Sequence, residues 1–269
     1  MTTPHSYVSP IPVRRAHLGD ALASEWTKIR SVRSTMWTLG VMVLLMLGIG
    51  LGVGALVAAN APDTEDASAL GLGFFGMLPG SICVITLGVL TIASEYGTGM
   101  IRTTLTACPS RTRVLTAKAI VFFLLVFTLT TVVTAVVGAI QVAMVDAVDP
   151  TGAEWLRATV GAGLYTALLG LLSLALGSVI RHSAGAITVM IGVLLLPLVA
   201  AMFMFSESMR AVQKALLTYA IPSQMISLYS ETPTLNGEGP TGWEPVLILL
   251  TVTAAALGGA YALLNRRDV

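Results

Sequence analysis

The side chains in this sequence that could carry out a reaction are few and scattered. Ser81, next to Gly80, would be a nucleophile if His182 lay close enough to take its proton. A serine hydrolase is not favoured, because Ser81 falls in the outer half of one apolar segment and His182 in a turn at the opposite membrane face. We expect a helix-packing role for Ser81 and a position at the lipid head groups for His182. The sequence has neither HExxH nor clustered carboxylates, so no metal site is predicted.

Energy conversion by the chain itself is also not indicated. Lys28, Lys118 and Lys214 all lack the glycine-rich turn that a phosphate-binding loop places before its lysine. The apolar segments have no ionisable residue near their middle, although ion-coupled transporters use such residues at the membrane midplane. Any pumping must therefore be powered by another polypeptide. Cys83 and Cys108 suggest neither a disulfide framework nor a zinc site.

Composition identifies the chain as an integral membrane protein. Of its 269 residues, 55% are hydrophobic and only 11% are charged. The net charge of +1 gives no reason to expect nucleic acid as a partner. Six apolar segments are each near the roughly 20 residues that a spanning helix needs, and they cover about 37–59, 74–93, 119–145, 158–180, 184–205 and 246–264. We predict an all-α fold with six transmembrane helices in a domain over 37–269.

The region before the first span divides into two parts. Residues 1–19 are rich in Pro, Ser and Thr, so we expect a mobile tail. Residues 20–36 have the apolar periodicity of an amphipathic helix, with Trp26, Lys28, Arg30 and Arg33 suited to a lipid head-group interface. The alternative is a soluble helix docked on a partner.

The distribution of basic residues predicts the orientation of the chain. With the N-terminus in the cytoplasm, twelve of the fifteen lysines and arginines fall on the inner side, and both termini are cytoplasmic. A cleaved signal peptide ending near ALVAANA is disfavoured, because over thirty residues precede an unusually long apolar run.

Two loops are long enough to fold. Residues 94–118 form a basic inner loop, in which we expect a short helix starting near Gly97 or Thr98 and broken by Cys108 and Pro109, with Ser110 capping the third span. Residues 206–245 should form two short outer helices, the first ended by Pro222 and the second capped by Ser223, followed by an exposed loop. The alternative is an outer cap that has no role in closing a pathway.

Glycines and prolines in the spans suggest packing and bending. In the first span, Gly48 with Gly52 and Gly50 with Gly54 have GxxxG spacing, which permits close helix approach within the chain or across a dimer. Pro79 and Pro197 should kink the second and fifth spans. Each kink is either a hinge or simple curvature.

The inner loop also carries a family resemblance. The pattern E-Y-G-T-x-x-x-R from Glu95 to Arg102, followed by Pro109-x-Arg111 and Ala117-Lys118, resembles the cytoplasmic loop of type-2 ATP-binding-cassette (ABC) transporter permeases, particularly the actinobacterial kind. SEWTKIRSVRSTMW before the first span, YAIPS in the outer segment and the NRRDV end extend the resemblance over nearly the whole chain.

This resemblance implies a membrane subunit of a bacterial exporter. The amphipathic segment would be a connecting helix, and the inner loop would carry a coupling helix that docks on a separate ATPase, which alone binds ATP and Mg²⁺. The coupling residues would be Glu95, Tyr96, Gly97, Thr98 and Arg102. Two permeases, as a homodimer in the cytoplasmic membrane, would pair with two ATPases and form the pathway mostly from the second and fifth spans, where Pro79 and Pro197 lie.

Other functions remain open from the residues alone. Apolar walls favour a lipophilic cargo such as a lipid, a drug or a peptide antibiotic. A non-transporting sensor or scaffold that docks a cytoplasmic partner through 94–118 is an alternative from a different class. A head-group-facing ion pair between Glu95 and Arg102 is the alternative to a coupling role for these two residues.

Overall fold

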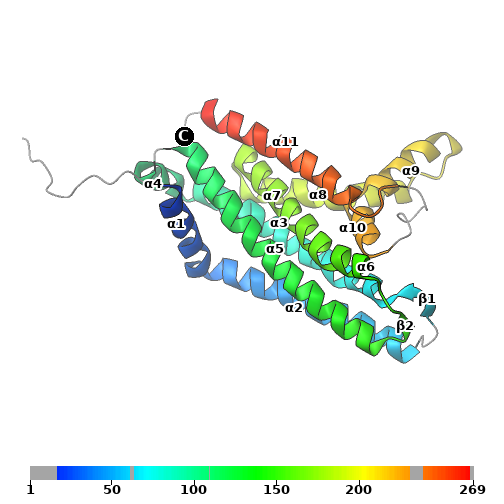
Figure 1. Cartoon of the computed structure of the whole chain (residues 1–269). Helices are drawn as coiled ribbons and strands as arrows, with labels where there is room; N and C mark the ends of the chain where they lie inside the picture. The colour runs from blue at the N-terminus through cyan, green and yellow to red at the C-terminus, as the bar shows by residue number, and fades with distance from the viewer. Residues whose placement is uncertain (1–16, 61–63, 109, 231–238, 267–269) are drawn as a thin grey trace, which may run out of the picture.

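The structure, a computed structural model, describes residues 17–60, 64–108, 110–230 and 239–266. It confirms the predicted all-α membrane architecture, with six helices long and apolar enough to cross a bilayer (Figure 1). They are α2 (Arg33–Asn60), α3 (Gly73–Gly97), α5 (Arg111–Met144), α7 (Ala162–Ile180), α8 (Ser183–Met202) and α11 (Glu244–Arg266). Residues 1–16 of the predicted tail, residues 61–63, Pro109, residues 231–238 of the predicted outer loop and the last three residues lie outside the described ranges.

Two of the spans are extended at one end. The α7 span begins earlier, at α6 (Gly152–Leu156), and continues through a wider, π-helical stretch at Arg157–Gly161. Thr151 and Glu154 form a capping box at its start. Helix α5 has 34 residues, which at 1.5 Å per residue is about 51 Å and well beyond a hydrocarbon core of about 30 Å.

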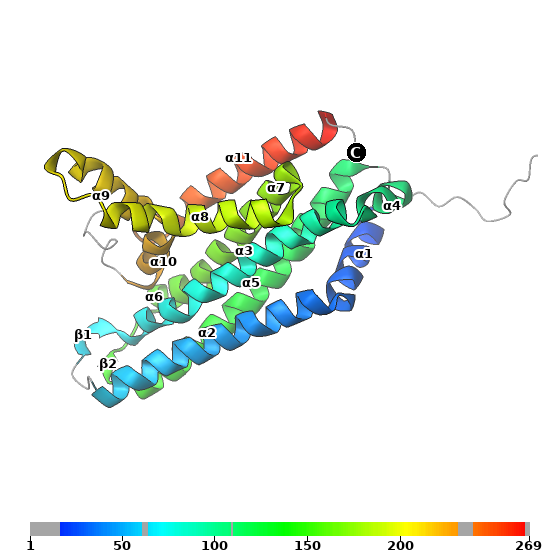
Figure 2. The same cartoon turned by 180° about the vertical axis from the view of Figure 1, so that it is seen from behind.

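Helices α3 and α7 form the centre of the bundle, and α2, α5, α8 and α11 surround them. Figure 2 shows the same arrangement from behind. Close approach at the centre depends on glycine. A Cβ atom on Gly170 of α7 would lie 2.5 Å from the Phe122 ring, and one on Gly88 of α3 would overlap the carbonyl of Gly170. These two glycines let α3, α5 and α7 pack with their backbones nearly in contact.

The glycines of α2 divide into two faces. Gly50 and Gly54 are buried, and a Cβ atom would meet Val137 at 2.9 Å or Gln141 at 3.1 Å. The Gln141 side chain donates a 2.8 Å hydrogen bond to the Gly50 carbonyl, which joins α5 to α2. Gly48 and Gly52 are exposed, and a Cβ atom added to either would meet nothing within 4 Å. One GxxxG pair therefore packs within the chain, whereas a dimer role for the other pair stays a prediction.

The two ends of the bundle carry different short elements. At one end lie α1 (Leu18–Ser31) and α4 (Met100–Ala107), together with the last described residue, Arg266 (Figure 1). We call this the α1/α4 end. At the other end lie α9 (Arg210–Tyr219), α10 (Ile221–Tyr229) and a small pairing of β1 (Thr64–Ser68) with β2 (Ala147–Val148).

The two helices between α8 and α11 exist as predicted, but their boundary differs. The first ends at Tyr219, and Pro222 lies in the first turn of α10 rather than ending α9. Proline is suited to this first turn because its missing N–H would have no helical partner there. Ser223 is therefore a fully buried residue of α10 and not its cap. Helix α9 is largely exposed, while α10 packs back against the bundle.

Candidate functional site

The inner loop predicted at 94–118 is mostly helical. Helix α3 continues through Gly97, Thr98 is its C-cap, and Gly99 adopts φ 72°, a left-handed conformation that glycine adopts without strain. The short helix therefore starts at Met100 and not at Gly97 or Thr98. Glu95, Tyr96 and Gly97 are on α3, and of the predicted coupling residues only Arg102, which is exposed, is on α4.

The start of α5 follows the sequence prediction more closely. Ser110 accepts a hydrogen bond from the backbone N–H of Arg113 at 3.4 Å, as expected for an N-cap. However, α5 begins at Arg111, eight residues before the predicted span. Lys118 is consequently part of the packed helix and not of a solvated loop.

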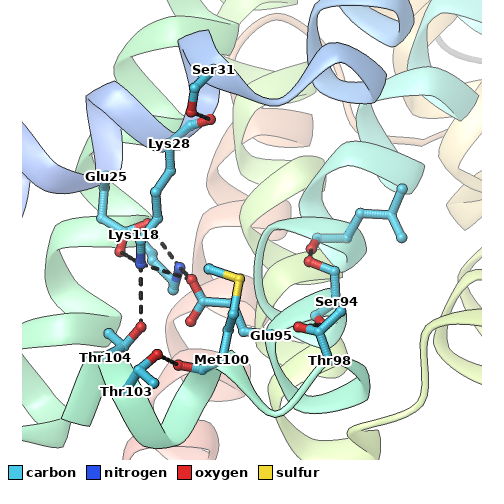
Figure 3. A network of polar contacts seen from close by, with 11 residues as sticks. Glu25, Lys28, Ser31, Ser94, Glu95, Thr98, Met100, Thr103, Thr104 and Lys118 are labelled. Atoms are coloured by element: carbon cyan, nitrogen blue, oxygen red, sulfur yellow. Dashed lines mark hydrogen bonds and ion pairs between the residues drawn. The ribbon is translucent and has the colours of Figure 1, made fainter. Parts of the chain in front are cut away.

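Four charged side chains meet at the α1/α4 end in a buried ion cluster, which we define as Glu25, Lys28, Glu95 and Lys118 (Figure 3). Lys118 Nζ lies 2.7 Å from Glu25 Oε2 and 2.7 Å from Glu95 Oε1. Lys28 Nζ lies 2.8 Å from Glu25 Oε1 and 2.8 Å from the same Glu95 oxygen. The cluster joins α1, α3 and α5, which are far apart in sequence.

The charges in this cluster are balanced and mostly removed from solvent. Lys118 is 1% exposed, and Glu25 and Glu95 are each 5% exposed. Two carboxylates face two ammonium groups, so the formal sum is zero. Because a buried charge without a partner is very costly, removing any one member should destabilise the packing by about 3–5 kcal/mol.

Lys28 is the more accessible cation of the cluster. Partial burial disfavours its charged form, but hydrogen bonds and charge from Glu25 and Glu95 outweigh burial, and its pKa is raised above the ordinary value. Lys28 also donates to Thr104 Oγ1 at 3.4 Å. This last contact reaches α4, so the short helix is connected to the cluster through a side chain as well as through the chain itself.

The amphipathic helix predicted over 20–36 is shorter than expected. Val32 is extended, with φ −83° and ψ 111°, so α1 ends at Ser31 and the chain turns into α2. Arg33 therefore lies at the start of α2 and not on the interfacial helix. Trp26 and Arg30 remain on α1 and are exposed, whereas Lys28 points into the cluster.

Further contacts connect the neighbouring helices at this end. The Arg181 guanidinium lies 5.0 Å above the Tyr96 ring, in the cation–π range, and joins α3 to the turn between α7 and α8. Arg111 donates to the Leu264 carbonyl at 3.0 Å, and the Thr116 and Tyr261 hydroxyls are 2.8 Å apart. The last two contacts attach α11 to α5.

Several other residues singled out from the sequence have local structural contacts and do not form a reactive site. Ser81 donates to the Leu78 carbonyl, and His182 accepts from the Gly185 N–H at the start of α8, so each has a local structural partner. Pro79 and Pro197 lie inside α3 and α8, and their hinge role stays a prediction. Within the described ranges, no group of His, Cys, Asp or Glu side chains could hold a metal ion.

Sequence reasoning missed Lys28 and Lys118 as the partners of Glu95, and Glu25 as the second carboxylate that shares these lysines. Glu95 does not pair with Arg102 but with the two lysines. One signal was present: Glu25 is three residues after Leu22 and four before Ile29, so it shares their helical face. An acidic residue on the buried face of an amphipathic helix indicates a buried basic partner.

The sequence was also compared with protein families. Residues 21–191 match the family described as ABC-2 family transporter protein. The chain belongs to this family. It is thus a membrane permease subunit of the ABC-2 type, which has no ATPase site of its own, and such permeases generally pair with an ABC ATPase. The match includes most of α1, all of α4 and the four residues of the ion cluster. No curated protein matched the sequence.

Proposed function

We propose that this permease subunit exports a lipophilic cargo across a bacterial cytoplasmic membrane, with α4 as the coupling helix that docks on the ATPase. The ATPase would bind ATP and Mg²⁺, and its closure would displace α4. Two copies of the chain, as a homodimer, would assemble with two ATPases. The observation that carries the proposal is the buried ion cluster, which lies directly beside α4.

Orientation is part of the proposal. Among the described residues, the α1/α4 end carries most of the lysines and arginines, which supports a cytoplasmic position for it and for both termini. Exposed Arg102 on α4 would then contact the ATPase. The other predicted coupling residues would not touch the ATPase but would pass on the movement of α4; they are Glu95, Tyr96, Gly97 and Thr98. Through their contacts, Glu95 and Tyr96 would transmit a movement of the α3–α4 junction to α1, to α5 and to the α7–α8 turn.

This arrangement suggests why a small displacement at α4 would affect several spans. The ion pairs and the Tyr96–Arg181 contact are short and buried or partly buried, so they resist separation. A displacement of α4 would therefore move α1, α3 and α5 as one unit rather than bend one of them. The differential affinity of inward- and outward-facing states for cargo would then drive transport.

The proposal is tested by purifying the tagged chain with its candidate ATPase and measuring ATP hydrolysis in proteoliposomes. Arg102→Ala should weaken the complex or uncouple hydrolysis while leaving the fold intact, because Arg102 is exposed. Arg210→Ala, exposed on α9 at the other end, is the matched control and should behave as wild type. A chain that binds no ATPase would refute the exporter function and favour the scaffold, which should show no ATPase coupling.

A further inference from the structure

Helix α1 is attached to the bundle with little apolar burial. All 14 of its residues are described, and among them only Glu25 is buried. Its apolar side chains stay partly or largely exposed, with Trp26 at 44% and Leu18 at 39%. Burial of an apolar face is the usual force that docks an amphipathic helix. The structure therefore gives α1 few apolar contacts that could hold it in place.

Open spaces meet α1 at three places. A cavity of about 360 Å³ lies between α1 and α4, with Ser24 and Thr103 among its lining residues. A second cavity, of about 290 Å³, lies between α1, the start of α2 and the end of α3. An apolar groove of about 670 Å³ runs between Trp26 and α5. Because protein interiors are normally close-packed, these spaces indicate that α1 is loosely packed on the bundle.

The buried attachment of α1 consists of ion pairs instead. Two contacts of the ion cluster cross from α1 to the bundle (Figure 3). Lys118 Nζ lies 2.7 Å from Glu25 Oε2, and Lys28 Nζ lies 2.8 Å from Glu95 Oε1. Lys28 also donates to Thr104 Oγ1 on α4 at 3.4 Å. All three contacts exist only while α1 is docked.

The cluster also divides into two neutral pairs, one on each side of this interface. Glu25 and Lys28 are both on α1, with their charged atoms 2.8 Å apart. Glu95 and Lys118 are both on the bundle, on α3 and α5, and are 2.7 Å apart. If α1 moves away, each side keeps a paired charge, so the high cost of an uncompensated buried charge does not arise. Separation at this interface loses two ion pairs but leaves no ion without a partner.

From these observations we propose that α1 is a reversible latch, which leaves α3 and α5 as a neutral unit and docks again through the ion cluster. The extended residue Val32, between α1 and α2, is the hinge. Release removes the contact between Lys28 and Thr104, so α4 loses its side-chain connection to α1. Docked α1 therefore moves with α4, and released α1 does not. The effect of release on transport rests on the proposed export function, whereas release itself does not.

The chain contains its own reporter of release, because it has three lysines: Lys28, Lys118 and Lys214. Lys118 is 1% exposed and should react with a water-soluble amine reagent only while α1 is away. Lys214 is exposed on α9 and is the internal reference. The full-length permease in lipid nanodiscs, without ATPase, is treated with N-hydroxysulfosuccinimide acetate. Mass spectrometry then gives the rate of acetylation at each lysine.

Two double variants with the same net charge differ only in which glutamate remains. The first, Lys28→Met/Glu25→Gln, keeps the ion pair within the bundle, and no charged pair then holds α1. The second, Lys28→Met/Glu95→Gln, keeps the 2.7 Å pair between α1 and Lys118, which holds α1 docked. Relative to Lys214, Lys118 should be acetylated about tenfold faster in the first variant, because one charge-assisted contact shifts a population by about that factor. Equal rates in the two variants would overturn the latch.

A tether gives a second test that leaves the ion cluster intact, and it decides alone if a cluster variant loses its helical circular dichroism. Ala21 and the native Cys108 both line the cavity between α1 and α4. In Ala21→Cys, a short flexible bismaleimide joins the two cysteines, and a monofunctional maleimide is the matched control. The tether raises the effective concentration of α1 at its site, so Lys118 acetylation should fall about tenfold or more while Lys214 acetylation is unchanged. If tethered and control proteins are acetylated alike at Lys118, the reagent reaches it without release of α1, and the proposal is refuted.

Discussion

Replacing Lys118 by methionine tests the ion cluster most directly. Methionine keeps an unbranched side chain of similar length but removes the ammonium group, which lies 2.7 Å from both Glu25 and Glu95. The two carboxylates would then share Lys28 alone, leaving one uncompensated negative charge at a site where each glutamate is 5% exposed. We expect Lys118→Met to lower the free energy of unfolding by about 3–5 kcal/mol.

A second substitution restores the charge balance and should partly rescue the protein. In the Glu25→Gln/Lys118→Met double variant, Glu95 and Lys28 remain as one balanced pair. The double variant should therefore cost only about 1–2 kcal/mol, mainly from lost hydrogen bonds, which is less than Lys118→Met alone. If the two substitutions acted independently, their losses of stability would add, and the double variant would be less stable than Lys118→Met alone.

The assay is equilibrium unfolding in mixed micelles, followed by helical circular dichroism. Lys214→Met, exposed on α9, is the control and should change stability by no more than about 0.5 kcal/mol. If Lys118→Met costs less than about 1 kcal/mol and the double variant is merely additive, the cluster is not the tightly paired site argued from its burial.

Three further outcomes follow from other contacts. Gly170→Ala should destabilise the bundle by about 1–3 kcal/mol, seen as a lower Tm, because its new Cβ would enter an aromatic ring of α5, whereas Gly192→Ala has open space and should be neutral or stabilising. Tyr96→Leu should lower the free energy of unfolding by about 0.5–2 kcal/mol, because it removes the ring beneath Arg181, whereas Tyr96→Phe keeps the ring and should lose much less. Equal losses for the two variants in unfolding experiments would contradict the cation–π contact. Since the pKa of Lys28 is raised on folding, its stabilising contribution is fully present below its unfolded pKa of 10.5 and disappears as pH rises through the higher folded pKa; an unfolding series from pH 7 to above 10.5 should show an alkaline loss that Lys28→Met lacks.

The sequence predicted the spans well because hydrophobic length is a local property. Each apolar run overlaps an observed helix. The helix-capping residue Ser110, and the residues that break a helix before it, also predicted the cap of α5 and the short helix that precedes it. The helix boundaries were harder to predict. The extended backbone at Val32 and the left-handed Gly99 place Arg33 and Gly97 on different helices from those expected.

The ion cluster could not be predicted in full, because it depends on distance in space and not in sequence. Glu25 and Lys118 are 93 residues apart, and Glu95 and Lys118 are 23 residues apart. The hydropathy of each segment says nothing about which charged ends will meet. Only the position of Glu25 on the buried face of α1 gave a local indication that a partner was needed.

The composition of this cluster also bears on how the chain is made. Glu25, Lys28 and Glu95 leave the ribosome before Lys118, and Glu25 does so 93 residues earlier. Until α5 is inserted, two carboxylates and one ammonium group must stay hydrated, because a charge without its partner is costly inside the bilayer. We therefore expect the first helix to stay at the water interface while α2 and α3 enter the membrane, and to dock only when the third span delivers Lys118. The last charge of the cluster to be synthesised thus sets the earliest moment at which α1 can dock on α3 and α5, before the central helix α7 is made.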